Sequence, residues 1–183
     1  EFPASGNGAS RTRGIVAGGR HPGNNYTNLI DYFPIASTGN ATNFGDISVN
    51  RHYGGIVSDG SRAVIGGGYD GSNSLNVIDY ITIASTGNAQ DFGDTAGVST
   101  DHGAFASPTK GVFGGNAESN QLQYITIATT GNTSDFGDLT SSTSQSGAGS
   151  NAVRGIISGG RSPSVHDTIE YVTIASNGDA IDF

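Results

Sequence analysis

The sequence predicts an all-β protein built from four copies of one antiparallel unit, and three observations support this. A run from a tyrosine to a phenylalanine occurs four times, at residues 32–44, 80–92, 124–136 and 171–183. Successive tyrosines are 48, 44 and 47 residues apart, a spacing typical of repeat architectures. Short apolar runs stop at glycines, and no apolar periodicity of 3.6 residues occurs, so we expect strands and no helices.

The first element of each unit is a short apolar strand that ends in glycines. The copies are residues 13–19, 62–68, 110–116 and 154–160. A polar loop of variable length follows each copy. Glycine commonly ends a strand and begins a loop, so we expect strands of four or five residues here.

The second element is a longer strand, as in residues 77–85. Its two faces carry Ile78 and Tyr80 on one side and Ile81 and Ile83 on the other, so we expect it to be covered on both sides. Ser-Thr-Gly-Asn at 85–88 then predicts a tight hairpin turn, because Gly and Asn tolerate positive φ. A third strand at 89–94 and a weaker fourth strand, as in residues 53–58, 102–107 and 146–151, complete the unit.

The two ends of the chain look like complementary parts of one unit. Residues 5–14 align with residues 102–111 and 146–155, and the chain stops at Phe183, in a third strand. Closing a row of sheets into a ring removes exposed edges. We therefore expect residues 1–183 to form a single domain of four repeats of about 47 residues. This domain is a four-bladed β-propeller of four-stranded antiparallel blades, closed by pairing of the N- and C-terminal strands, with the last blade shared between the termini.

Charge and composition exclude several classes of function. The net charge of −8 disfavours nucleic acid and anionic membranes, which select basic surfaces. The chain has no cysteine, and no stretch approaches the roughly 18 apolar residues of a membrane span. It begins at Glu1 instead of a methionine, so we expect a processed product or a piece of a longer protein.

The repeated runs resemble known repeats. The pattern RGI-x-x-GG followed by a Tyr-bearing strand resembles the kelch blade, although this chain has no tryptophan. Residues 78–94, 124–139 and 154–160 are more similar to kelch-like repeats in virion structural and tail proteins of marine bacteriophages. The resemblance implies a non-enzymatic structural or adhesive module at a virion or extracellular location. Its implied partners are other virion proteins, copies of itself and possible host surface glycans.

Two sets of charged residues recur at equivalent positions in the units. The cations are Arg13, Arg62, Lys110 and Arg154, and the carboxylates are Asp46, Asp94 and Asp138. Either set could form a ring that lines a central channel. A structural role is favoured, because every unit must build the same blade.

The variable loops after the glycines are the candidate ligand-binding region, since recognition is commonly placed on loops that vary over a constant scaffold. Their amide, aromatic and charged side chains can hydrogen-bond to sugars and stack on them. The candidate residues are His21, Asn25, Tyr26, Tyr69, Asp70, Asn73, Glu118, Asn120, Arg161 and His166. The simpler interpretation is that these loops are solvated and bind nothing.

Other motifs favour no catalytic chemistry. Residues 66–71 fit G-x-G-x-x-G, but a strand follows instead of the helix that a dinucleotide site needs. The histidines lack metal-ligand spacing, and no G-x-S-x-G segment occurs. We expect no cofactor, with calcium on loop oxygens as an open alternative although no EF-hand segment is present. A free-standing lectin with one site per blade is the alternative function, and an enzyme with its site in the channel is less favoured.

Overall fold

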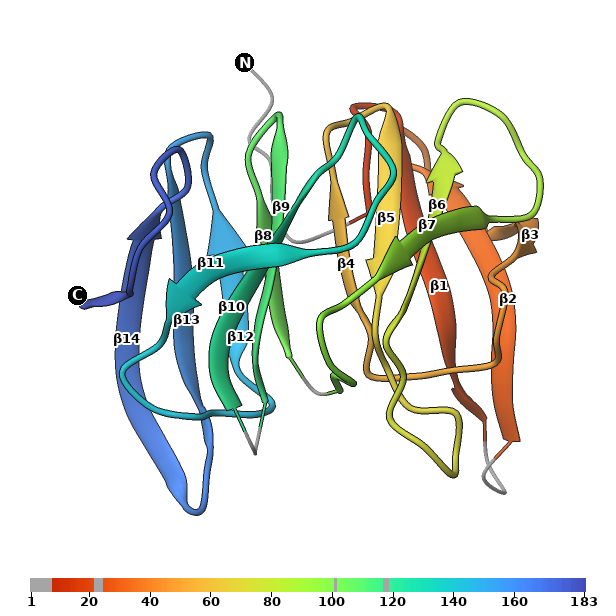
Figure 1. Cartoon of the computed structure of the whole chain (residues 1–183). Helices are drawn as coiled ribbons and strands as arrows, with labels where there is room; N and C mark the ends of the chain where they lie inside the picture. The colour runs from red at the N-terminus through yellow and green to blue at the C-terminus, as the bar shows by residue number, and fades with distance from the viewer. Residues whose placement is uncertain (1–7, 22–24, 101, 117–118) are drawn as a thin grey trace.

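The computed structural model describes residues 8–21, 25–100, 102–116 and 119–183, and within them the protein is all-β with no helix. The strands form four antiparallel sheets arranged as a four-bladed β-propeller (Figure 1). The predicted fold class is therefore confirmed.

The blades follow one another along the chain. Blade 1 contains β1 (Arg13–His21), β2 (Asn25–Pro34) and β3 (Thr42–Asp46). Blade 2 contains β4 (Gly55–Ser58), β5 (Arg62–Gly66), β6 (Val77–Thr82) and β7 (Gln90–Asp94). Blade 3 contains β8 (Gly103–Ala106), β9 (Lys110–Asn116), β10 (Ser119–Thr126) and β11 (Ser134–Asp138). Blade 4 contains β12 (Gly147–Ser150), β13 (Arg154–Arg161), β14 (Val165–Thr173) and β15 (Ile181–Asp182).

The short strand that the sequence placed last in a unit is the first strand of the blade that follows it. β4 pairs with β5 across residues 59–61 only, whereas the linker from β3 to β4 covers residues 47–54. Short connections favour hairpins between neighbouring strands. The short strands lie toward the middle of the molecule, where β8 contacts both β4 and β12.

The terminal segments pair differently from the expected shared blade. Ala9 forms a bridge with Gly14, and Ile15 N donates to Gly8 O at 2.7 Å, so this segment belongs to blade 1. At the other end, β15 pairs with β14 of its own blade. Residues 1–7, which include part of the expected N-terminal strand, lie outside the described residues. Within the described residues, blade 4 is completed by its own β12, because a three-residue connection already joins β12 to β13.

The core lies between neighbouring blades. Three buried apolar clusters join blades 1 and 2, blades 2 and 3, and blades 3 and 4. As expected, the second strand of an inner blade is covered on both sides, since Ile78 and Ile81 of β6 are both buried.

The Ser-Thr-Gly-Asn segment at 85–88 joins blades as well as strands. The connection from β6 to β7 is residues 83–89, longer than the expected tight turn. In it, Gly87 N donates to Phe44 O of blade 1 at 2.8 Å. The same approach between blades 2 and 3 requires glycine: Gly93 has φ +143°, and a Cβ there would lie 2.5 Å from Gly131 O.

Candidate functional site

The strand ends that flank the four variable loops lie on one face of the propeller. The ends of β1, β5, β9 and β13 and the starts of β2, β6, β10 and β14 all lie at the lower end in Figure 1. They share a face because equivalent strands run in the same direction in each blade. Glu118 lies outside the described residues.

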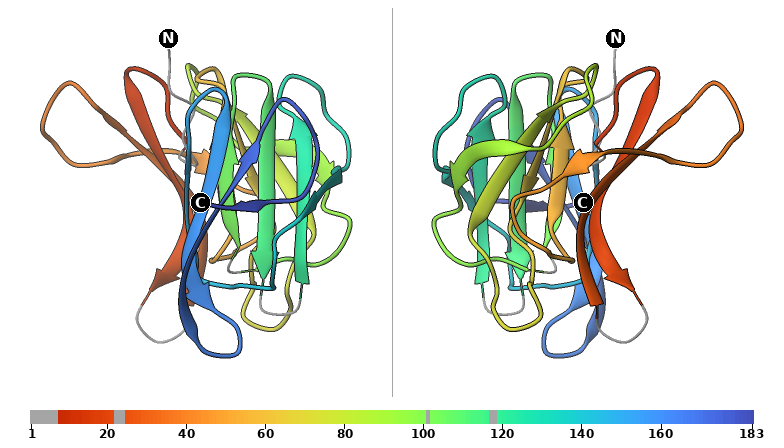
Figure 2. Two further views of the ribbon diagram at one scale, coloured as in Figure 1. Left: turned by 90° about the vertical axis from the view of Figure 1, so that its left-hand side faces the viewer. Right: turned by 90° about the vertical axis from the view of Figure 1, so that its right-hand side faces the viewer.

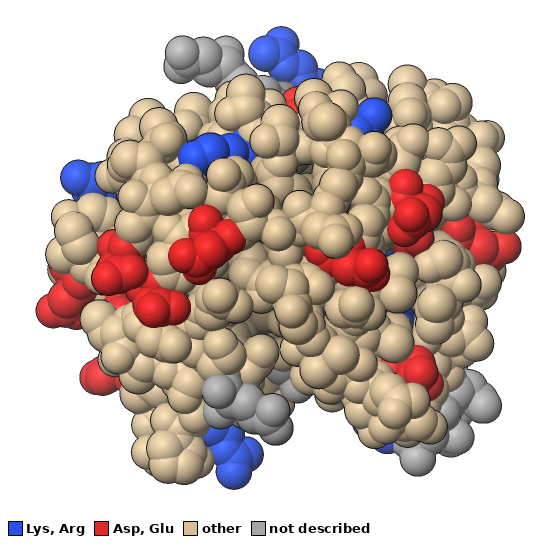
Figure 3. All heavy atoms as spheres, viewed as in Figure 1, with Lys and Arg blue, Asp and Glu red and all other residues tan. Residues whose placement is uncertain are grey.

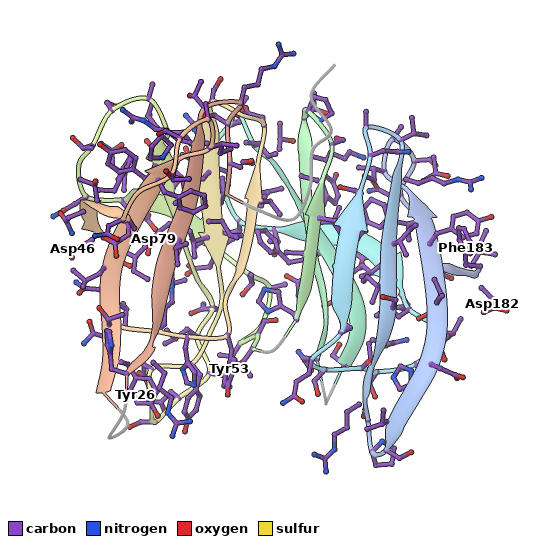
Figure 4. All side chains as sticks on the ribbon, turned by 180° about the vertical axis from the view of Figure 1, so that it is seen from behind. Tyr26, Asp46, Tyr53, Asp79, Asp182 and Phe183 are labelled. Carbon is purple, nitrogen blue, oxygen red and sulfur yellow. The ribbon has the colours of Figure 1, made fainter. Side chains whose placement is uncertain are left out.

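Four rings gather on this face between blades 1 and 2, and we name them the aromatic cluster: Tyr26, His52, Tyr53 and Tyr69. The centroid of the His52 ring lies 3.9 Å from that of Tyr53, 4.7 Å from that of Tyr26 and 5.7 Å from that of Tyr69. Tyr26 and Tyr69 meet edge to face at 6.5 Å. Figure 4 shows Tyr26 and Tyr53 together at this end of the molecule.

Backbone pairing positions the middle of the cluster. His52 N donates to Tyr69 O at 3.1 Å, and Tyr69 N donates to His52 O at 2.8 Å. The His52 Nδ1 lies 3.0 Å from Tyr69 O. A carbonyl oxygen only accepts, so Nδ1 carries the hydrogen and Nε2 is left for another partner. Tyr26 reaches the cluster from β2, and its ring lies against Gly71, where a Cβ would meet it at 2.2 Å.

Tyr53 is the most accessible ring of the cluster. Half of it is exposed, at 50%, and its φ is +61°. Few non-glycine residues adopt positive φ, and those that do concentrate at functional sites. The stacking on His52 holds this aromatic ring at the surface.

A pocket of about 230 Å³ lies beside the cluster. Its apolar wall includes Ile15, Ile56 and Ile65, and His52 and Tyr53 also line it. An apolar wall with aromatic and hydrogen-bonding groups is typical of small-ligand sites.

A buried ion pair lies beneath the cluster. The Nη2 of Arg51 donates to Asp79 Oδ2 at 2.7 Å, and both side chains are almost completely buried. Ser48 donates to the same oxygen from its backbone N at 3.1 Å and from its hydroxyl at 2.7 Å. Burial lowers the pKa of Arg51, and the carboxylate of Asp79 acts in the opposite direction. These bonds attach the linker that carries His52 and Tyr53 to blade 2.

The structure separates the other loop candidates from the cluster or uses them in the fold. Asp70 Oδ1 accepts from the backbone N of Asn73 and of Ser72, both at 2.7 Å. These bonds, with that from Asn73 the larger cause, lower the pKa of Asp70. The candidates Asp70 and Asn73 therefore form a turn.

In blades 1, 3 and 4 the remaining candidates take part in pairing or packing. Asn120 Nδ2 donates to Leu139 O at 2.8 Å. His166 Nε2 lies 2.9 Å from Thr143 Oγ1. His21 pairs with Asn25 where β1 meets β2, and Arg161 pairs with Val165 where β13 meets β14.

The repeated cations do not lie on the innermost strands, and those of blades 1, 2 and 3 donate to the next blade. Each lies over the tyrosine of its own blade, at 4.4 to 4.7 Å from the ring centroid: Arg13 over Tyr32, Arg62 over Tyr80, Lys110 over Tyr124 and Arg154 over Tyr171. Arg62 Nη1 also donates to Ile127 O of the next blade at 2.9 Å. The repeated aspartates donate their backbone N–H to the next blade, as Asp94 does to Asn132 Oδ1 at 3.0 Å.

Acidic side chains form a band across the outer surface of the blades (Figure 3). The outer strands β7 and β11 cross this face in Figure 1, and each carries two aspartates. This band adds to the overall negative charge and is unfavourable for polyanions.

His52, Tyr53 and Arg51 were missed as site residues by the sequence analysis. Arg51 and His52 fall in a segment that the repeat predicts to be a linker, and Tyr53 was expected to begin the short strand 53–58, whereas β4 begins at Gly55. The available signal was the His-Tyr pair at 52–53, an aromatic pair that the other linkers lack.

No group of three or more His, Asp or Glu side chains suited to a metal ion occurs in the described part of the chain. The same residues contain no helix long and apolar enough to cross a membrane. No protein-family model matches the chain, and no curated protein matches it.

Proposed function

We propose that the protein is a non-enzymatic binding module of a bacteriophage particle, and that it recognises surface glycans through the aromatic cluster. The observation that carries the proposal is the gathering of Tyr26, His52, Tyr53 and Tyr69 from two blades and a linker into one accessible group.

The chemistry of the cluster suits sugars. An aromatic face packs on the C–H groups of a sugar ring, while phenol and imidazole groups hydrogen-bond to its hydroxyls. The partly strained backbone of Tyr53 fixes one such ring in the lining of the pocket. A rigid ring loses little conformational entropy on binding.

The virion context is supported by the sequence. The runs at residues 78–94, 124–139 and 154–160 resemble kelch-like repeats of phage structural and tail proteins. The acidic surface favours neutral or cationic ligands over nucleic acid. A scaffold of near-identical blades with variable loops on one face suits attachment.

A free-standing lectin with one site per blade is the second candidate, and a different observation favours it. Two equivalent pockets, of about 280 and 290 Å³, lie beside Ser-Thr-Gly-Asn at 85–88 in blade 2 and Thr-Thr-Gly-Asn at 129–132 in blade 3. Tyr80 and Asn88 line the first, and Tyr124 and Asn132 line the second. Repetition of a pocket offers repeated weak sites whose affinities combine.

The test is binding of the purified protein to a printed array of bacterial surface glycans. We expect Tyr53→Ala and Tyr69→Ala each to weaken binding about tenfold, the loss expected from one aromatic contact. Val165→Ala is the matched control, because Val165 is exposed on the same loop face but lies in blade 4.

Stoichiometry separates the two candidates. One sugar bound per chain and lost with Tyr53→Ala supports the aromatic cluster. Two or more sugars per chain, retained in Tyr53→Ala and weakened by Asn88→Ala, support the lectin with repeated sites. Absence of binding to any glycan of the array overturns both.

A further inference from the structure

The three formed interfaces between blades share one set of backbone bonds. In each, a glycine N after the second strand donates to the phenylalanine O of the preceding blade. The pairs are Gly87 with Phe44, Gly131 with Phe92 and Gly178 with Phe136, at 2.7 to 2.8 Å. The equivalent donor in blade 1 is Gly39, and no bond joins it to Phe183 within the described residues.

The face of blade 1 that points away from blade 2 is apolar and exposed. Ile35 is 53% exposed, whereas its equivalent in blade 2, Ile83, is 1% exposed. Val16 and Phe33 lie on the same side and are also exposed. We name Val16, Phe33 and Ile35 the blade 1 face.

The face of blade 4 that points away from blade 3 is also apolar and exposed. Phe183 is 67% exposed, whereas its equivalent Phe92 is 2% exposed. Ile169 is exposed too, although its equivalent Ile78 is fully buried. We name Ile169, Tyr171 and Phe183 the blade 4 face.

The polar groups on these two faces match as well. Arg13 and Arg62 each donate to the carbonyl of an isoleucine in the next blade, at 2.8 and 2.9 Å. Arg154, on blade 4, lies over Tyr171, and no bond to a following blade is present in the described residues. The carbonyl of Ile35 on blade 1 is the equivalent acceptor.

Shape is complementary at the inner end of the faces. At the interface between blades 3 and 4, Phe105 fills the space over Gly155. The equivalent of Phe105 in blade 4 is Gly149, and nothing lies within 4 Å of a Cβ placed there. On blade 1, Phe33 instead covers Gly14, the equivalent of Gly155. The bulky ring therefore stands on blade 1, where blade 4 offers only a glycine.

Both exposed faces lie on the same side of the molecule. Figure 1 places blades 1 and 4 at opposite ends of the row of blades. In the left view of Figure 2 both lie toward the left, the side that faces away from the viewer in Figure 1. Seen from behind in Figure 4, the strands near the middle are visible between these two blades. The faces thus point outward together and not toward each other.

We propose that a second copy of this chain covers both faces, with blade 4 of each copy packed on blade 1 of its partner. The contact repeats the interface seen between neighbouring blades of one chain. It would form the equivalent bonds, from Gly39 N to Phe183 O and from Arg154 to Ile35 O. A two-fold pair uses both faces of both copies and leaves no unpaired blade, which a single head-to-tail contact would leave. The assembly is a ring of eight blades.

The experiment measures mass in solution by light scattering and sedimentation. We expect the protein to have twice the chain mass of 18.5 kDa. Ile35→Glu on blade 1 and Ile169→Glu on blade 4 should each weaken association about 100-fold or more, because each places a charge in an apolar contact. Val98→Glu is the control: Val98 is 60% exposed in the linker between blades 2 and 3, outside both faces.

Mixing the two face variants tests which surfaces meet. The Ile35→Glu chain keeps an intact blade 4 face, and the Ile169→Glu chain keeps an intact blade 1 face, so an equimolar mixture should form mixed dimers through one interface. Circular dichroism checks that each variant folds. A monomeric parent protein, dimers that survive both substitutions, a mixture that stays monomeric, or open polymers would each overturn the proposal.

Discussion

His102 makes the stability of the propeller sensitive to acid. The side chain is buried, and Gly55 N donates to its Nε2 at 3.2 Å. The Nδ1 therefore carries the hydrogen and donates to Ser99 Oγ at 3.0 Å. Protonation of Nε2 would place two N–H groups against each other in a buried site. Burial lowers the pKa of His102 from its ordinary 6.5 to about 4.

The magnitude follows from this change in pKa. Above pH 6.5 the imidazole is neutral in both the folded and the unfolded chain, so its contribution to stability is fully present. As pH falls from 6.5 to about 4 the unfolded chain binds the proton and the folded chain does not, so the free energy of unfolding decreases. At about 1.4 kcal/mol for each pH unit, the total loss from this residue is about 3 kcal/mol.

The assay compares urea unfolding of the parent protein and of His102→Gln between about pH 7.5 and about pH 4. Glutamine can accept from Gly55 N and donate to Ser99, but it does not titrate. On acidification over this range, we expect the free energy of unfolding of the parent protein to fall by about 3 kcal/mol more than that of the variant. Because the carboxylates are common to both proteins, their titration cancels. A difference that stays constant with pH would refute this account of His102.

Three further predictions concern stability and are measured by urea unfolding. Asp79→Ala leaves Arg51 buried without its anion and should lower the free energy of unfolding by about 3–5 kcal/mol. The double variant Arg51→Met with Asp79→Leu should lose less stability than this single variant, because no buried charge is left unpaired. An equal or greater loss in the double variant would contradict this reasoning. Gly93→Ala should destabilise by about 2 kcal/mol or more, because of its positive φ and the nearby Gly131 O, while Gly97→Ala, in open space, should change stability by less than about 0.5 kcal/mol. Similar values for these two glycines would show that the close approach does not matter. In a chain that already carries Ile35→Glu, Arg62→Met should lower the free energy of unfolding by about 1–2 kcal/mol, because it removes both the contact with Tyr80 and the bond to Ile127 O. Arg154→Met in the same chain should lower it by less, because only the contact with Tyr171 is lost. A larger loss of stability at Arg154 would contradict the assignment of the exposed faces.

The repeat itself was predictable from the sequence, because it is written in local spacing. The glycine-terminated strands, the two-sided second strand and the third strand all follow from alternation and breakers over a few residues. The four-bladed propeller followed from counting these units. The recurrence of the cations predicts a structural position. In the structure Arg13, Arg62 and Lys110 donate to the next blade, whereas Arg154 lies on the exposed face of blade 4.

The start of each blade was misplaced for a physical reason. A repeat in sequence has no intrinsic first element, so the period alone cannot say whether residues 53–58 end one blade or begin the next. Connection length decides it, since residues 59–61 allow a hairpin and the linker 47–54 does not. The expectation about the chain ends depended on this choice.

What the sequence determined alone is the set of strands and their number, since each strand depends on residues adjacent in the chain. Only the tertiary structure decided which side chains meet: Tyr26 with Tyr69, Arg51 with Asp79, and Gly55 with His102 are 43, 28 and 47 residues apart. It also decided which apolar faces are covered, because Ile35 and Ile83 occupy the same place in the repeat and differ only in whether a blade precedes them. Burial depends on which groups lie nearby in space, and equivalent residues of a repeat have the same local sequence whether or not a neighbouring blade covers them.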